Sequence, residues 1–478
     1  MRDAASSSCN RYGVALLLMA AYTLNCADRT LIAIIGQPLK IDLQLSDTQL
    51  GALVGAAFAA LYAISGIPIA RLAERFNRVN ILFVVMTVWS GLTALCGVAT
   101  SFVQLLLLRM GVGFGEAGCS PPAHSLLSDY FEPRRRATAL SIYSCGISLG
   151  YILSAALGGY IAAHFGWRMA CVALGVPGVA IAAIIKLSVR EPRVGSPQPV
   201  RKFGLRGDLR ELVGVAASLA LRWPMANFVL GLTVASFASQ GAWAFVPAFF
   251  NRVFELDYAT IGVVAALTGG VPVGLGLLAG GYVADLLGAR SARWYALVPA
   301  IGLVIATPLY VSAFVQSEWK LTALLLGLGG FFQYISFGPT LGVIQNVVTE
   351  RRRATATAFV YVILNVVALG GGALFTGWLI DRFADFNLIH PSRAAFPSFA
   401  AVFGSPLLSP QASFRAVCPG GQAAAATGQA AHALCRATLA QSSRQGILLT
   451  VLLYAWAAAH YVLGAFGLGR EMQSVRSH

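Results

Sequence analysis

Long apolar stretches dominate this 478-residue sequence, and each is close to the roughly twenty residues that an α-helix needs to cross a bilayer. Soluble domains carry charge on about a quarter of their residues. Here only 11% of the residues are charged and 57% are hydrophobic. We therefore predict an all-α integral membrane protein with twelve transmembrane helices, at residues 13–36, 48–70, 80–99, 104–127, 137–162, 168–188, 225–249, 259–284, 292–315, 321–346, 354–380 and 446–469.

The net charge of +15 comes from Lys and Arg residues in the short segments between the apolar stretches. If the amino terminus lies inside the cell, most of these residues face the cytoplasm, as the positive-inside rule requires. We therefore expect a multi-pass protein of the cell (inner) membrane with both termini cytoplasmic. Membrane lipids are the natural partner of this charge. No soluble basic module is present to bind nucleic acid.

Two irregular segments divide the chain. Residues 190–222 are basic and contain prolines, and we interpret them as a cytoplasmic linker between an N-terminal six-helix bundle (1–189) and a C-terminal one (223–478). Residues 382–445 are rich in Ala, Ser, Gly and Pro, which predicts a long outward loop within the second bundle.

The two halves repeat each other. The six residues from Arg134 to Ala139 recur letter for letter from Arg351 to Ala356, before a Gly-rich helix in each case. A second pair, Ala73-Glu74 and Ala284-Asp285, follows the second helix of each half. Repeats of this kind predict two pseudo-symmetric bundles with a cleft between them, on which alternating access can be built.

The motifs resemble those of the major facilitator superfamily. Residues 70–78 (ARLAERFNR) are similar to the family pattern Gly-x-Leu-Ala-Asp-Arg-x-Gly-Arg after helix two. Residues 25–29 (NCADR) and 109–117 (RMGVGFGEA) resemble motifs of the spinster family within it. The resemblance implies the major facilitator fold, secondary active transport and, as one candidate substrate, an amphiphilic anionic lipid of the lysolipid or sphingolipid kind.

Four ionisable residues fall at membrane depth, namely Asp28, Arg29, Arg109 and Glu116. Intramembrane charge is costly unless it is paired or hydrated, so such residues are functional candidates. An anionic substrate that binds Arg29 would leave Asp28 without its neutralising partner and drive it to take up a proton. We predict Asp28 and Glu116 as proton-coupling residues, Arg29 and Arg109 as substrate contacts, and a supporting pair between Arg109 and Glu116. The alternative is a fixed ion network that holds helices one and four together.

The second half has almost no charge within its spans, and its polar and aromatic residues predict an apolar wall for the substrate. The candidates are Gln240, Trp243, Phe332, Gln333, Tyr334 and Phe337. Aromatic side chains in membrane helices also commonly face lipid or pack against other helices, and that interpretation stays open.

Glu74, Arg75, Arg78 and Asp129 lie at cytoplasmic helix ends, where ion pairs can form a gate. The positive-inside rule alone accounts for the Arg residues but not for the two acids. Cys418 and Cys435 are the two cysteines of the predicted outward loop. In an oxidising exterior they can form a disulfide, and the sequence leaves open whether they are bonded or free. The sequence contains no metal cluster, phosphate loop or nucleophile triad, and we expect no cofactor and no enzymatic activity.

These features predict a secondary active transporter that moves an amphiphilic anion by alternating access, coupled to protons through Asp28, and acts as a monomer. A proton-coupled carrier of small organic anions is the alternative. A non-transporting membrane receptor with this fold is a third interpretation.

Overall fold

The computed structural model describes residues 11–132, 135–192, 214, 217–218, 220–347, 353–390, 399–404, 412–423 and 428–474. Within these ranges the secondary structure is helical and contains no strand. Eleven apolar helical segments are long enough to cross a membrane, and one of them, Thr138–Ser188, is 51 residues long. Its backbone breaks at Gly166, where φ is +81°, a conformation that favours glycine. This segment therefore supplies two passes, and the prediction of an all-α protein with twelve spans is confirmed.

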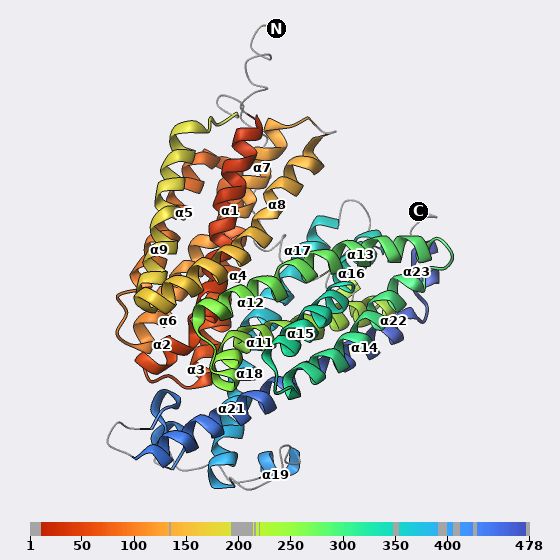
Figure 1. Cartoon of the computed structure of the whole chain (residues 1–478). Coiled ribbons are helices and arrows are strands. Elements are labelled where there is room, and N and C mark those ends of the chain that lie inside the picture. The colour runs from red at the N-terminus through yellow and green to blue at the C-terminus, as the bar shows by residue number, and fades with distance from the viewer. Residues whose placement is uncertain are drawn as a thin grey trace. The chain divides into compact units, whose positions relative to one another are not determined.

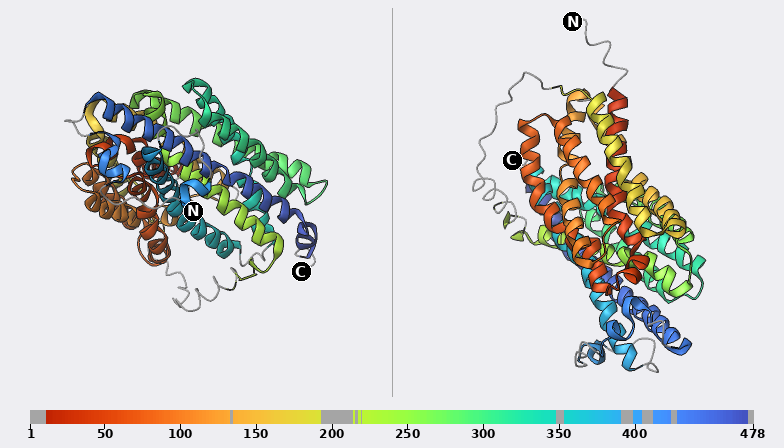
Figure 2. Two further views of the ribbon diagram at one scale, coloured as in Figure 1. Left: turned by 90° about the horizontal axis from the view of Figure 1, so that it is seen from below. Right: turned by 90° about the vertical axis from the view of Figure 1, so that its left-hand side faces the viewer.

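The chain folds into two units. The first comprises residues 1–45, 52–202 and 256–266. Its helices, seen from further directions in Figure 2, are α1 (Arg11–Ile34), α2 (Gly36–Asp42), the π-helix η1 (Ala52–Ala56), α4 (Ala57–Arg75), α5 (Arg78–Cys96), α6 (Phe102–Glu116), α7 (Ser120–Tyr130), α8 (Arg136–Leu153), the π-helix η3 (Ser154–Gly158), α9 (Gly159–Ser188) and most of α12 (Tyr258–Gly269).

The second unit comprises residues 46–51, 203–255 and 267–478. Its helices, labelled in part in Figure 1, are α3 (Asp47–Gly51), α11 (Trp223–Phe254), α13 (Val271–Gly288), α14 (Trp294–Val315), α15 (Trp319–Tyr334), α16 (Phe337–Val347), α17 (Arg353–Ile363), the π-helix η5 (Leu364–Leu369), α18 (Gly370–Ile389), α19 (Phe399–Gly404), α20 (Phe414–Val417), the 3₁₀ turn η6 (Pro419–Gly421), α21 (Gln429–Val451), α22 (Leu453–Ala465) and α23 (Leu468–Ser474).

The core of the first unit follows from the spacing of apolar residues along its helices. In α1 the buried positions include Val14, Leu18, Ala21 and Leu24, which recur every three or four residues and so form one stripe. Asn25 and Asp28 continue this stripe and are therefore buried with it. The sequence periodicity thus places two polar groups inside the bundle.

The predicted outward loop at 382–445 contains more helix than its composition indicated. α18 continues to Ile389, and α21 begins at Gln429. A disulfide joins Cys418 to Cys435 on α21, with 5.8 Å between their Cα atoms. Two further contacts attach this region to α18, because Arg382 donates to the carbonyl of Val402 at 2.9 Å and the carboxylate of Asp385 accepts from the backbone N–H of Phe414 at 2.7 Å.

Candidate substrate and proton site

The four ionisable residues predicted from the sequence come together in the first unit. Asp28 and Arg29 lie on α1, and Arg109 and Glu116 lie on α6. Asp28, Arg109 and Glu116 are each only 1% exposed. The side chain of Arg29 is 26% exposed, so it is the member of this cluster that an incoming solute can reach.

The pairing within the cluster differs from the expected one. Arg29 donates from Nε to Oε2 of Glu116 at 2.6 Å, so Glu116 pairs with Arg29 and not with Arg109. Arg109 and Glu116 are seven residues apart on α6, which is a rise of about 10 Å along the helix axis. Arg109 instead donates weakly to the backbone carbonyl of Asp28 at 3.5 Å. The carboxylate of Asp28 accepts a hydrogen bond from the hydroxyl of Thr93 at 3.1 Å.

Two aromatic rings on α4, which the sequence analysis missed, cover the cluster. The rings of Phe58 and Tyr62 stack with their centroids 5.1 Å apart. The guanidinium of Arg29 lies 4.9 Å from the first centroid and 4.6 Å from the second, and that of Arg109 lies 5.6 Å from Phe58. Cation–π contacts of this length stabilise a desolvated cation. The sequence signal that could have identified these residues is the occurrence of two aromatics four residues apart on a predicted span.

Several buried polar atoms of the cluster have no hydrogen-bond partner among the described residues. They include Oδ1 of Asp28, Oε1 of Glu116, Nε and Nη2 of Arg109, and both amide atoms of Asn25. Buried polar groups are nearly always satisfied in folded proteins, and exceptions concentrate at functional sites. Each carboxyl group thus keeps one oxygen that can take a proton without losing an existing hydrogen bond.

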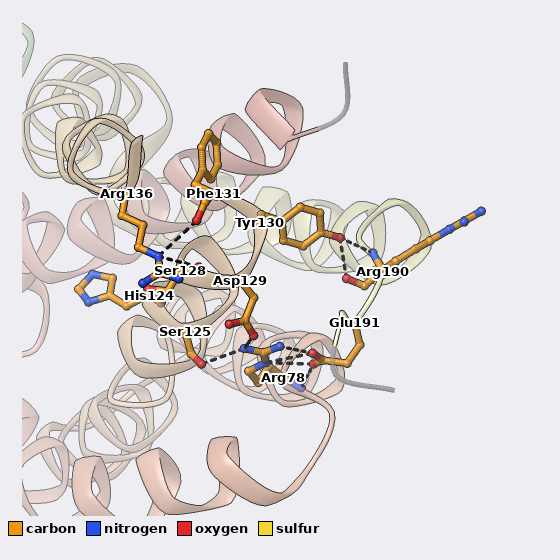
Figure 3. A network of polar contacts seen from close by, with 10 residues as sticks. All are labelled: Arg78, His124, Ser125, Ser128, Asp129, Tyr130, Phe131, Arg136, Arg190 and Glu191. Atoms are coloured by element: carbon orange, nitrogen blue, oxygen red, sulfur yellow. Dashed lines mark hydrogen bonds and ion pairs between the residues drawn. The ribbon is translucent and has the colours of Figure 1, made fainter. Parts of the chain in front are cut away.

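A second polar network, drawn in Figure 3, lies where α5 begins and α7 ends. Arg78 donates from Nη1 to Oδ2 of Asp129 at 2.7 Å and to the hydroxyl of Ser125 at 2.8 Å. Its Nε lies 3.1 and 3.2 Å from the two carboxylate oxygens of Glu191, which also accepts the backbone N–H of Arg78 at 2.7 Å. The side chain of Arg78 is only 1% exposed.

The residues of this network differ in part from those of the predicted gate. Arg78 and Asp129 are brought together, whereas the side chains of Glu74 and Arg75 lie outside the described part of the chain. Glu191, which the sequence analysis left within the linker, completes the network. All three connected residues belong to the first unit, so the network ties helix ends within one bundle.

In the second unit, four of the predicted wall residues line one pocket of about 190 Å³, namely Gln240, Gln333, Tyr334 and Phe337. Trp243 and Phe332 do not line it. Phe332 packs edge-on against Phe331 with 5.2 Å between their centroids, and Phe331 lines a separate apolar groove next to α13. The pocket is more polar than the predicted wall, because eight of its fourteen lining residues carry a hydroxyl or amide group.

Comparisons with known proteins agree with this architecture. A model of the Major Facilitator Superfamily matches residues 18–371. The chain is 33% identical over 365 residues to an MFS-type efflux pump of Mycolicibacterium smegmatis, covering 76% of this chain and 83% of that protein. It is 27% identical over 425 residues to the hexuronate transporter of Bacillus subtilis, covering 85% of this chain and 97% of that protein.

A solved structure is also similar over nearly the full length. The crystal structure of a bacterial homologue of the human lysosomal transporter spinster, in an inward-facing and unoccupied conformation, matches with a TM-score of 0.80 and 30% identity, covering 96% of this chain and 98% of that one. The resemblance to the spinster family is thereby confirmed. No group of three or more potential metal ligands occurs among the described residues. The chain belongs to the major facilitator superfamily and is a multi-pass membrane transporter, not an enzyme.

Proposed function

We propose that this protein is a secondary active transporter that moves an organic anion by alternating access and couples it to protons through Glu116 and Asp28. The observation that carries the proposal is the ion pair between Arg29 and Glu116. Its cation is 26% exposed while its carboxylate is fully buried. An anion that reaches this pair meets the cation first.

The coupling follows from competition for Arg29. A substrate carboxylate or phosphate that takes the guanidinium displaces Glu116 from its 2.6 Å contact. Glu116 is then a buried carboxylate without a counter-charge, and it binds a proton because an unpaired buried charge is costly. Asp28 supplies a second buried carboxyl with an unbonded oxygen. Substrate binding and proton binding therefore favour each other, which is the thermodynamic requirement for coupled transport.

Two substrate classes are compatible with this site. The resemblance of the sequence motifs to the spinster family implies an amphiphilic anion such as a lysolipid. The similarity to the hexuronate transporter of Bacillus subtilis favours a small organic anion. In both cases Arg29 contacts the anionic group, and the buried Arg109 adds positive charge behind it. Membrane lipids surround a monomeric protein.

The Arg78 network is proposed as part of the gate at the cytoplasmic end of the first bundle, with both chain termini on that side. The charge bias of the interhelical segments supports this orientation. Arg78 holds the carboxylates of Asp129 and Glu191 together, so the start of α5, the end of α7 and the segment after α9 move as one body.

The test is uptake into proteoliposomes under an imposed pH gradient. The probes are D-glucuronate as a small organic anion and a lysophosphatidate as an anionic lysolipid. Glu116→Gln and Asp28→Asn are expected to lose proton-driven accumulation by at least tenfold while they keep substrate binding. The matched control is Asp42→Asn, because Asp42 belongs to the same unit and pairs with Arg168 in a half-exposed ion pair. Full proton-driven accumulation by both Glu116→Gln and Asp28→Asn would contradict the proposal.

A further inference from the structure

Buried polar side-chain atoms without a hydrogen-bond partner are concentrated in the first unit. Ten such atoms occur in the part of the chain that the structure describes, and nine of them belong to this unit. One is on Arg11 at the start of α1, and the other eight are on Asn25, Asp28, Trp89, Arg109, Glu116 and Ser154. Each of these six residues is at most 1% exposed. Folded proteins satisfy such atoms with protein groups or with bound water, so their concentration marks a binding site.

The helices α1 and α5 bring two of these residues to one level. They are the first and third spans, so they cross in the same direction. The hydroxyl of Thr93 on α5 donates to the carboxylate of Asp28 on α1 at 3.1 Å, which fixes the register of the two helices. Asn25 precedes Asp28 by three residues on α1. Trp89 precedes Thr93 by four residues on α5. Asn25 and Trp89 therefore both lie about one helical turn, or ~5 Å, to the same side of this hydrogen bond.

Glu116 on α6 lies at the level of Asn25 and Trp89. A Cβ atom built on Gly115 would lie 2.8 Å from the Cβ of Trp89, so α6 touches α5 at the residue before Glu116. The ion pair between Arg29 and Glu116 links the same end of α6 to α1. Asn25, Trp89 and Glu116 thus form one layer of the site.

Asp28 and Arg109 form a second layer about one turn away. Arg109 donates to the backbone carbonyl of Asp28 at 3.5 Å, which places the two residues at one level. Nε and Nη2 of Arg109 and Oδ1 of Asp28 have no partner within the described residues. The first layer adds Nε1 of Trp89, Oε1 of Glu116 and both amide atoms of Asn25. The two layers therefore contain seven buried polar atoms that a ligand can satisfy.

Water is the ligand that fits these seven atoms. A metal cation would be repelled by the guanidinium of Arg109, and an anion would be repelled by the carboxylates of Asp28 and Glu116. A neutral molecule that both donates and accepts can bind the donors and the acceptors together. A buried water typically makes about three hydrogen bonds, so roughly two or three molecules satisfy the seven atoms.

We propose that these atoms hold a cluster of buried waters and that this cluster passes protons between Glu116 and Asp28. The inference rests on the proposed function, in which both carboxyl groups exchange protons, and it adds the path between them. A proton leaves Oε1 of Glu116 for a water oxygen, and that water gives another of its protons to the next water or to Oδ1 of Asp28. Only O–H bonds form and break. The layers are ~5 Å apart, a distance that two successive hydrogen bonds of about 2.8 Å span.

Asn25 and Trp89 are positioning residues for this transfer, because they bind the waters and do not carry the proton. Asn25→Leu keeps the branched shape of the side chain but removes one donor and two acceptor sites. Each net hydrogen bond that is lost lowers the occupancy of a bound water about fivefold. Trp89→Phe keeps an aromatic ring and removes the only hydrogen-bonding group of that side chain.

The first test is hydroxyl-radical labelling of the purified full chain by X-ray radiolysis, read by mass spectrometry. Radicals formed from a bound water label the side chains beside it even where these side chains are buried. Trp89 is therefore expected to be labelled faster than Phe228 after correction for the intrinsic reactivity of each residue type. Phe228 is likewise 0% exposed and packs against Tyr461, whose hydroxyl is hydrogen-bonded to Thr340 at 2.8 Å.

Asn25→Leu is expected to slow the labelling of Trp89 at least about fivefold. The matched control is Asn80→Leu, which should leave this labelling unchanged. Asn80 belongs to the same unit, is exposed, and accepts a hydrogen bond from Lys186. Labelling of Trp89 that is no faster than that of Phe228 would overturn the water site.

The second test separates proton transfer from substrate movement in proteoliposomes. The probe is whichever of D-glucuronate and the lysophosphatidate the unmodified protein accumulates. Asn25→Leu and Trp89→Phe are each expected to slow pH-driven uptake at least about fivefold. Exchange of labelled for unlabelled probe at equal pH requires no net proton transfer, so it should stay unchanged. Unchanged pH-driven uptake in both variants, or equal loss of uptake and exchange, would overturn the role in proton transfer.

This inference and the proposed function fail separately. If Glu116→Gln and Asp28→Asn keep full proton-driven accumulation while the labelling of Trp89 depends on Asn25, the coupling proposal falls and the water site stands. If both carboxyl variants lose proton-driven accumulation but Trp89 is not labelled, only the water cluster falls.

Discussion

Arg252 forms a buried ion pair in the second unit, and its removal gives the largest effect on stability that we expect from one substitution. Its Nη2 lies 2.5 Å from Oδ1 of Asp47, and the two side chains are 2% and 1% exposed. Arg252 also donates to the hydroxyl of Ser443 at 2.9 Å. Asp381 brings a second carboxylate to the same place, because it accepts from the backbone N–H groups of Asp47 and Thr48 at 2.9 and 2.8 Å.

The close packing of α3 against α18 prevents this site from relaxing. A Cβ atom built on Gly377 would lie 2.1 Å from the carbonyl oxygen of Asp47, so the two backbones are in direct contact. Arg252→Met keeps most of the side-chain volume but removes the cation that pairs with the carboxylate of Asp47. Breaking a buried pair by removing one partner costs about 3–5 kcal/mol. With about 2.1 cal/mol/K of unfolding entropy per residue, a chain of 478 residues then loses about 3–5 °C in Tm.

The assay is thermal unfolding of the purified protein, with Arg436→Met as the matched control. Arg436 pairs with Glu255 at 3.3 Å, but the side chains are 66% and 74% exposed, so its loss should cost at most about 1 kcal/mol. The double variant Asp47→Asn with Arg252→Met should recover part of the lost stability, because it also removes the buried carboxylate charge that Arg252 neutralised. Equal changes in Tm for Arg252→Met and Arg436→Met would refute the reasoning.

Two further predictions concern helix ends. Arg78→Gln should lower Tm by several degrees and raise protease sensitivity after α9, because Asp129 and Glu191 lose their shared cation; an unchanged Tm would contradict the assigned role. Hydrogen bonds from the backbone N–H and hydroxyl of Thr260 hold the pKa of Asp257 below its usual range. The Asp257 carboxylate therefore stabilises α12 fully above its unfolded-state pKa, and this stabilisation is lost as the pH falls through the lower folded-state pKa. Asp257→Ala should speed amide exchange at Thr260 about fivefold at pH 7 but little near pH 2. An equal effect at both pH values would refute this role of Asp257.

The sequence predicted the spans well because bilayer thickness imposes a length that composition reveals directly. The ends of the predicted loop at 382–445 were less accurate. α21 begins at Gln429, seventeen residues before the start of the predicted span at 446–469. Helix formation depends on backbone propensity and packing, not on hydrophobicity, so a polar helix that extends beyond the membrane leaves no signal in an apolar-run search.

The sequence predicted which ionisable residues come together at the candidate site but not which of them contact one another. Charge at membrane depth identified Asp28, Arg29, Arg109 and Glu116 without any structure. Which carboxylate meets which cation depends on the rotation and spacing of α1 and α6, and one sequence does not contain that information. The same limit applies to the wall of the second unit, where residue type gave the aromatics but not the direction in which Trp243 and Phe332 point.

The hydrogen bonding of the buried carboxylates separates those suited to transport from those suited to structure. Both oxygens of Asp381 accept hydrogen bonds from α3, so a proton there would cost existing contacts. Asp28 and Glu116 each have one occupied oxygen and one without a partner among the described residues. A carboxylate whose oxygens are all bonded stabilises one conformation, whereas one with an unbonded oxygen can gain and lose a proton at little structural cost. This difference, and not the presence of buried charge alone, supports the proposal that protons exchange in the first unit while the ions of the second unit have a structural role.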